Sequence, residues 1–227
     1  MASLKDIRRR ISTVKNTQQI TKAMKMIAAV KLRKAQDQIL ACRPYAYELM
    51  SLIANLALHM ETEHHPLLAQ KKPKRVHVFV VTSNRGLCGS YNGNIIRQAE
   101  RFFREKADGF EHLEISFIGK KGHDYFKRRL NPKWIGKLHA NIMGERTFDH
   151  AVLLANDMME HFIQGKFDHV YFIYNEFKSA MSQKVVVETA LPVTPAKPDV
   201  KAQRIDYIYE PSREELLSFL LPKYIRT

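Results

Sequence analysis

The sequence predicts an α/β protein in which a long N-terminal coiled-coil helix precedes a Rossmann-like domain with a mainly parallel sheet. Three observations predict this fold. Residues 4–42 carry apolar side chains at alternating steps of three and four, with no helix breaker before Pro44. From residue 76 onward, β-branched runs alternate with amphipathic stretches. The 227 residues, 45% of them hydrophobic, are enough for one sizeable core and an appendage.

Four segments follow from these patterns. We expect a long basic helix over 1–60, a linker over 61–75, the α/β domain over 76–195, and over 196–227 a connector with the start of a C-terminal helix. Two cysteines fit a reducing compartment. The N-terminus lacks the apolar core of a secretory signal, and no apolar run approaches the roughly 20 residues of a membrane span.

The N-terminal helix begins with a weak capping box, Ser3 with Asp6. At 1.5 Å per residue, a helix over 4–42 is about 58 Å long. Pro44 is expected to kink it before helical periodicity resumes to Met60. Such a helix cannot bury its seam alone, so it requires a partner helix. The seam is apolar at both ends and polar or small in the middle: Leu4, Ile7, Ile11, Val14, then Gln18, Thr21, Lys25, Ala28, then Leu32, Ala35, Ile39, Cys42.

The positive charge is concentrated in this helix. The chain has a net charge of +14, and residues 1–34 hold ten basic residues against Asp6 alone. A basic segment of this kind implies an anionic partner, which is nucleic acid, a lipid surface or an acidic protein surface. Composition does not choose among the three.

The α/β domain is predicted from its strands. We expect buried strands at 76–82, 113–119 and 167–177, and a fourth at 181–193 that lies at an edge. Helices are expected after the first strand, at 120–130 and at 147–165. A last helix begins at Ser212, where Pro222 is expected to interrupt it, and the chain stops at Thr227 without a terminator.

The glycine-rich loop "NRGLCGSYNG" follows the first strand. Its glycines do not have the dinucleotide spacing, and Gly119-Lys120 stands where a ribose-binding acid is expected. "GKKG" is no Walker loop, because no Ser or Thr follows the lysine. We therefore expect a tight turn that needs positive φ and presents Arg85 to another protein. The histidines of residues 59–65 match no common metal spacing, and no catalytic residues or cofactor are expected.

Several segments resemble one family, the γ subunit of the F-type ATP synthase. They are "LKDIRRRISTVKNTQQITKAMKMIAAVKLRKAQ", "RGLCGSYNGN", "MSQ" and "DYIYEPS". The resemblance covers essentially the whole chain. Family members continue into a second long helix, antiparallel to the first, which is expected to be missing here after Thr227.

The resemblance implies a non-catalytic central rotor that couples proton-driven rotation to ATP synthesis at the β subunits. It implies as partners the α and β subunits of the catalytic ring, the ε subunit and the c-subunit ring. The complex is expected at the cytoplasmic face of a bacterial plasma membrane, with this chain as a peripheral component. Small or flexible apolar residues on the helix suit sliding past equivalent positions, and flanking cations suit acidic loops of β. The implied contacts with the ring are Lys22, Met24, Lys25, Met26, Lys31, Arg33, Lys34 and Arg85.

Two alternatives stand beside the rotor. One is a basic coiled-coil nucleic-acid-binding protein with an α/β domain, which the lack of interleaved aromatics and of groove-reading motifs disfavours. The other is a dinucleotide-binding enzyme, which the missing ribose carboxylate disfavours.

Overall fold

The computed structural model describes residues 3–58, 65–142, 147–179, 182–195 and 209–227. The chain divides into two compact units, residues 1–48 and 49–227. Helix α1 (Leu4–Leu58) begins in the first unit and ends in the second. Three expectations fall partly outside the described residues: most of the histidine segment 59–65, the connector over 196–208, and Met181 of the "MSQ" segment.

Helix α1 is 55 residues long, about 82 Å at 1.5 Å per residue. Its start is capped as predicted: the Ser3 backbone N–H donates to the Asp6 carboxylate at 3.2 Å, and Lys5 N–H donates to Ser3 Oγ at 3.1 Å. Pro44 lies inside this helix, which continues beyond it to Leu58, as the resumed periodicity predicted.

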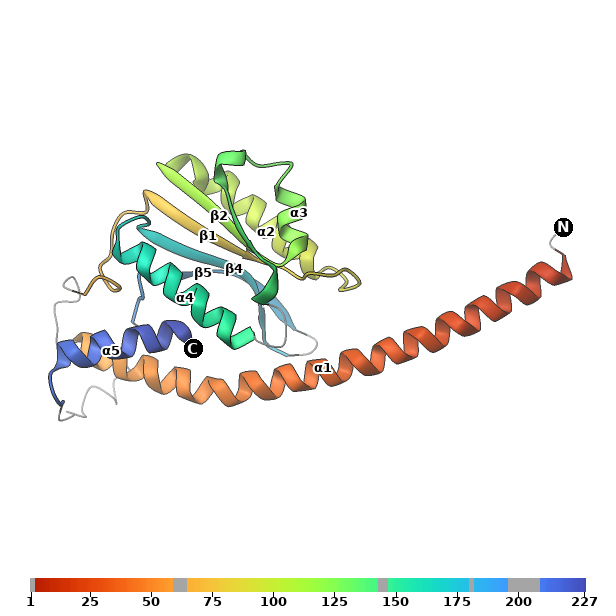
Figure 1. The fold of residues 1–227 in the computed structure, drawn as a ribbon, viewed down its shortest axis with the longest axis horizontal. Helices are drawn as coiled ribbons and strands as arrows, with labels where there is room; N and C mark the ends of the chain where they lie inside the picture. The colour runs from red at the N-terminus through yellow and green to blue at the C-terminus, as the bar shows by residue number, and fades with distance from the viewer. Residues whose placement is uncertain (1–2, 59–64, 143–146, 180–181, 196–208) are drawn as a thin grey trace. The chain divides into compact units, whose positions relative to one another are not determined.

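The second unit is built on a five-stranded sheet (Figure 1). Its strands are β1 (Arg75–Val81), β2 (His112–Ile118), β3 (Ile135–His139), β4 (His169–Phe177) and β5 (Gln183–Leu191), in the order β3-β2-β1-β4-β5. All neighbours are parallel except β4 and β5. The mainly parallel sheet and the edge position of 183–191 are confirmed.

Helices cover both faces of the sheet, so each face carries its own core. Helices α2 (Tyr91–Lys106) and α3 (Lys120–Phe126) cover one face, where Phe103 of α2 shares a core with Val78 and Phe117 of the strands. The opposite face packs against α4 (Thr147–Ile163), α5 (Arg213–Arg226) and the end of α1 from Leu49 onward. Period-2 alternation along β1 sends Val76, Val78 and Val80 to the first core and Phe79 to the second.

Two further elements differ from the prediction. Strand β3 was not expected, since it is short and partly exposed and contains Gly136 and Lys137 instead of a β-branched run. Pro222 does not interrupt α5, which runs to Arg226. Its N-cap is the predicted one, with Glu215 N–H donating to Ser212 Oγ at 3.2 Å.

Candidate functional site

The basic stretch of α1 is an exposed helix surface. Every residue from 22 to 34 is exposed, Met24 and Met26 at 46% and 58%. Its cations, Lys22, Lys25, Lys31, Arg33 and Lys34, make no ion pair within the described part of the chain. The segment therefore offers unpaired positive charge and flexible apolar side chains in one short stretch.

These cations point around the whole helix instead of along one side. At 3.6 residues per turn, Lys22 and Arg33 are about 20° apart around the helix axis, whereas Lys31 lies on the side opposite Lys22. Met24 and Lys31, seven residues apart, share that opposite side. A helix that presents charge in every direction suits a partner that surrounds it better than a partner that lies along one face.

The glycine-rich loop lies in the second unit, between β1 and α2, and its own side chains hold it. Asn92 Oδ1 accepts from the backbone N–H of Ser83 at 3.0 Å, and Asn92 Nδ2 lies 2.9 Å from Ser83 Oγ and 3.1 Å from Cys88 Sγ. Asn84 connects the loop to two other segments: its Nδ2 donates to the Ala140 carbonyl at 2.8 Å, and its Oδ1 accepts from Lys120 N–H at 3.0 Å. The loop is therefore a fixed platform.

Positive φ in this loop is found at Gly89 (57°) and, unexpectedly, at Leu87 (61°). Gly86 and Gly93 do not have it, so the expectation holds for one of the three glycines. Leu87 is 92% exposed, and Arg85 beside it is exposed as well. The loop thus presents a cation and an apolar side chain to solvent.

The start of α3 packs tightly against the loop. A Cβ added to Gly119, at φ 99°, would lie 2.0 Å from the Thr82 carbonyl oxygen. The backbone N–H groups of Lys121 and Gly122 donate to Ser83 O at 3.1 Å and to Thr82 Oγ1 at 2.8 Å. These donors, which a phosphate would need at a helix start, are occupied by the protein itself. The start of α3 therefore offers neither of these two donors to a phosphate.

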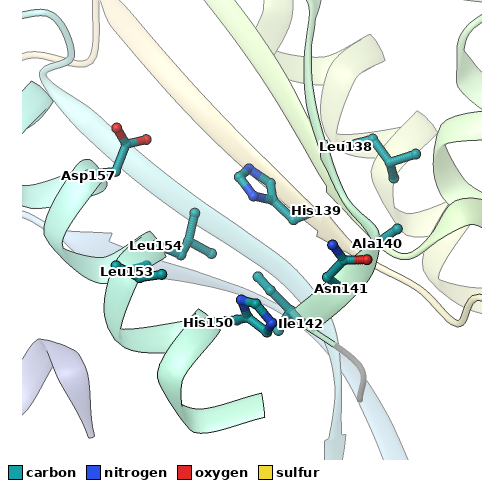
Figure 2. Close-up of a pocket in the computed structure, with 9 residues that line it drawn as sticks. All are labelled: Leu138, His139, Ala140, Asn141, Ile142, His150, Leu153, Leu154 and Asp157. Carbon is teal, nitrogen blue, oxygen red and sulfur yellow. The ribbon is translucent and has the colours of Figure 1, made fainter. Parts of the chain in front are cut away.

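A pocket of about 320 Å³ lies between the end of β3 and α4 (Figure 2). His139, Asn141, His150 and Asp157 supply its polar side chains, and burial lowers the pKa of His139. Its other lining residues are Leu138, Ala140, Ile142, Leu153 and Leu154. None of the described residues that line the pocket carries a hydroxyl or a thiol.

Behind this pocket, His77 is buried in the sheet. Its Nε2 lies 2.9 Å from Ser116 Oγ and 3.8 Å from a Glu114 oxygen, and its ring packs at a tilt against Phe79 and Phe167. Burial lowers the pKa of His77 to about 3, with nearby cations adding to the shift. The imidazole is therefore neutral at physiological pH and acts as a packed, hydrogen-bonded core group.

Neither a metal centre nor a membrane span is found in the described ranges. No group of three or more potential ligands there could hold a metal ion. None of the helices in those ranges combines the length and the apolar character that a membrane crossing requires.

Comparison with known proteins gives the family. A family model described as ATP synthase matches residues 3–227. An ATP synthase gamma chain of Geobacter sp. (strain M21) is 44% identical over 225 residues, 99% of this chain and 77% of the relative. That of Anaeromyxobacter dehalogenans (strain 2CP-1) is 47% identical over 229 residues, 99% of this chain and 78% of the relative.

A comparison with solved structures gives the same family. A chain in the cryo-EM structure of the central stalk and c-ring of the Tetrahymena thermophila mitochondrial ATP synthase has a TM-score of 0.63 and 25% identity, covering 91% of this chain and 88% of that chain. The fold and these relatives define the class: a non-catalytic rotor subunit of the central stalk. The chain belongs to the ATP synthase gamma chain family.

The sequence-predicted contact residues belong to two separate units of the chain. Seven of them lie on α1 in the first unit and Arg85 lies on the loop of the second unit. Sequence reasoning missed Leu87 and the packing of Lys120 and Lys121 against the loop. The signal for Leu87 was its place in the run Gly86-Leu87-Cys88-Gly89. The packing of α3 depends on Gly119, which is distant in sequence.

Proposed function

We propose that residues 22–34 of α1 are the part of this rotor that contacts the ring of α and β subunits. The contact residues are Lys22, Met24, Lys25, Met26, Lys31, Arg33 and Lys34, with Arg85 on the loop of the second unit facing an acidic loop of β. The N-terminal helix over 1–60 serves as the shaft, and the α/β domain of 76–195 meets the ε subunit and the c-subunit ring. The complex lies at the cytoplasmic face of the bacterial plasma membrane, with this chain peripheral.

The observation that carries the proposal is the spread of exposed cations around α1, with methionine and alanine between them. Exposed ion pairs are each worth at most about 1 kcal/mol, so no single angular position is deeply favoured. Methionine adapts its packing as the surrounding surface changes. A helix built in this way is guided by an acidic ring without being locked to one β subunit.

A charge-neutralised variant tests this. Lys22→Gln, Lys25→Gln and Arg33→Gln are combined in one chain, and binding to the ring of α and β subunits is measured at several salt concentrations. Lys5→Gln, Arg8→Gln and Arg10→Gln make the control, with the same charge change outside the contact stretch. We expect weaker binding and a flatter salt dependence for the first variant only. Equal binding by wild type and both variants at every salt concentration would contradict the proposal.

A further inference from the structure

The pocket between β3 and α4 lies wholly within the second unit of the chain. Figure 2 shows residues 138–142, at the end of β3, facing the turns of α4 from His150 to Asp157 across the pocket. Its volume of about 320 Å³ falls within the range of small-molecule sites in proteins. The carboxyl ends of parallel strands, where residues 138–142 lie, are also where open α/β sheets ordinarily bind ligands. The pocket therefore has the size and the place of a ligand site.

The lining of this pocket combines an apolar wall with a small number of polar groups. Its apolar members are Leu138, Ala140, Ile142, Leu153 and Leu154, and its polar side chains are those of His139, Asn141, His150 and Asp157. Sites that bind small molecules ordinarily have such a lining, in which the polar groups orient the ligand and the apolar wall covers the rest of it. A ligand that matches this lining has an apolar body and one polar or charged end.

Positive charge outweighs negative charge at the polar end of the pocket. Of the described residues that line it, Asp157 is the only acidic one. The Oδ2 atom of Asp157 lies 3.8 Å from Lys137 Nζ and 3.8 Å from His161 Nδ1. Burial lowers the pKa of His139, and the charge of Lys137 lowers this pKa by more than the carboxylate of Asp157 raises it. An anion that approaches His139 is therefore attracted.

The neighbouring His77 shows the same sign of charge. Both histidine rings lie near Phe79, with centroids 4.2 Å from it for His77 and 6.0 Å for His139. After burial, all the groups that lower the pKa of His77 to about 3 are basic side chains. The titratable and charged groups around these two histidines are Glu114, Lys137, His150, Asp157, His161 and Lys166. This part of the sheet face is therefore basic on balance.

We propose that this pocket binds a small organic acid, whose carboxylate is held by His139 and His150 and whose apolar body lies against Leu153 and Leu154. Each imidazole has a ring N–H that can donate to a carboxylate oxygen. A bare inorganic anion would leave the leucines uncovered, and a cation would be repelled by Lys137. The proposal does not depend on how α1 or the loop after β1 contacts other subunits.

Binding of such an acid is coupled to uptake of a proton. A carboxylate beside His139 favours the imidazolium form, which burial and Lys137 disfavour in the free chain. The carboxyl group of the ligand, with a pKa of about 4, stays ionised between pH 6 and pH 8. Affinity should therefore rise as the pH falls from 8 to 6, because the complex takes up a proton that the free chain does not hold.

Benzoate is the probe for the test, and two ligands are its controls. Benzamide has the shape of benzoate without its charge, and inorganic phosphate has charge without an apolar body. Titration calorimetry on the 227-residue chain gives each Kd at pH 6 and pH 8. Shifts of assigned backbone amide signals in NMR spectra locate the site, which should lie at residues 138–142 and 150–157.

Three variants separate the roles of the side chains. His139→Gln removes the titrating ring, and Asp157→Asn removes the one carboxylate of the described lining. Glu105→Gln is the matched control, because it removes the same charge from an exposed position on α2, outside the pocket. The thermal midpoint of each chain is recorded in parallel, so that loss of binding is distinguished from loss of folding.

At pH 6 we expect the Kd for benzoate to be lower by about tenfold or more than that for benzamide or phosphate. The Kd for benzoate should rise by about threefold or more between pH 6 and pH 8. His139→Gln should raise the Kd by about tenfold at pH 6 and abolish the dependence on pH. Asp157→Asn should lower the Kd by up to about fivefold, and Glu105→Gln should leave it unchanged.

Several results would overturn the proposal. Benzamide binding as tightly as benzoate would exclude selection of an anion, and phosphate binding as tightly would exclude a role for the apolar wall. Amide shifts confined to residues outside the pocket, or no benzoate binding at all, would exclude the site. Wild-type affinity in a folded His139→Gln chain would remove the role of His139. If His139→Gln does not fold, Asp157→Asn decides, because weaker binding of benzoate by that variant would contradict an anionic ligand.

Discussion

The Cα of Gly119 lies so close to the Thr82 carbonyl that an added Cβ would be 2.0 Å from that oxygen. Gly119 also has a φ of 99°, which only glycine adopts readily. We expect Gly119→Ala to destabilise the second unit by more than about 2 kcal/mol, because both the clash and the backbone strain oppose folding. The measurement is the free energy of unfolding from a denaturant titration.

Gly109 provides the matched control, because a Cβ there meets nothing within 4 Å and its φ is not positive. Gly109→Ala should change the free energy of unfolding by less than about 0.5 kcal/mol. Equal stabilities for the two variants would show that the contact between the ends of β1 and β2 is not as tight as described.

His77 gives the second unit a pH dependence with a defined sign. Its pKa is lowered by burial from 6.5 to about 3, so the unfolded chain binds a proton that the folded chain excludes. Stability is therefore complete above pH 6.5 and is lost progressively as the pH falls toward about 3. At pH 5 the loss is about 2 kcal/mol. The charged and titratable groups near His77 are Glu114, Lys137, His139, His161 and Lys166.

The measurement is the free energy of unfolding between pH 7.5 and pH 5 for wild type and His77→Phe. Phenylalanine keeps the ring contacts with Phe79 and Phe167 and removes the titrating group. The slope of stability against pH should be smaller in the variant, whatever its absolute stability. Parallel curves would contradict the assignment.

Cys88 is a structural contact of the loop. Its Sγ accepts from Asn92 Nδ2 at 3.1 Å, and the hydrogen bonds between Asn92 and Ser83 do not depend on it. Cys88→Ala should therefore leave assembly and the ATP hydrolysis rate of the complex nearly unchanged. A loss of rate beyond about tenfold, equivalent to about 1.4 kcal/mol of barrier, in a correctly assembled complex would assign the thiol a chemical role.

Patterns that repeat along the chain predicted most of the fold. The 3-4 spacing of apolar residues predicted α1, and the β-branched runs predicted β1, β2, β4 and β5. Strand β3 was missed because its pairing with β2 depends on a partner strand instead of its own composition. Pro222 was overestimated as a breaker, since local preference yields to the surrounding helix and its packing.

The candidate site was less predictable for a physical reason. The cations of α1 are visible in the sequence because they are close together along one helix. The surface around Leu87 joins a loop after β1 with a helix after β2, through a glycine contact between residues 82 and 119. Parallel strands bring such segments together at one edge of a sheet, and only the register shows which side chains meet there.

The central claim is that residues 22–34 of α1 tune how the rotor couples rotation to ATP chemistry. Met24 is 46% exposed and lies on the same side of the helix as Lys31. We expect Met24→Lys to add a cation that can pair with an acidic loop of the nearest β subunit. Such a pair lowers the free energy of one angular position of the rotor relative to the positions between. A partly desolvated pair shifts this balance by about 1–3 kcal/mol, which is tenfold or more in rate. Met24→Leu keeps volume and polarity and is the control.

The measurement is the ratio of ATP-driven proton uptake to ATP hydrolysis in membrane vesicles, with each variant in the assembled complex. We expect Met24→Lys to assemble and to hydrolyse ATP but to take up fewer protons per ATP, whereas Met24→Leu matches wild type. A Met24→Lys ratio equal to that of wild type would contradict the claim.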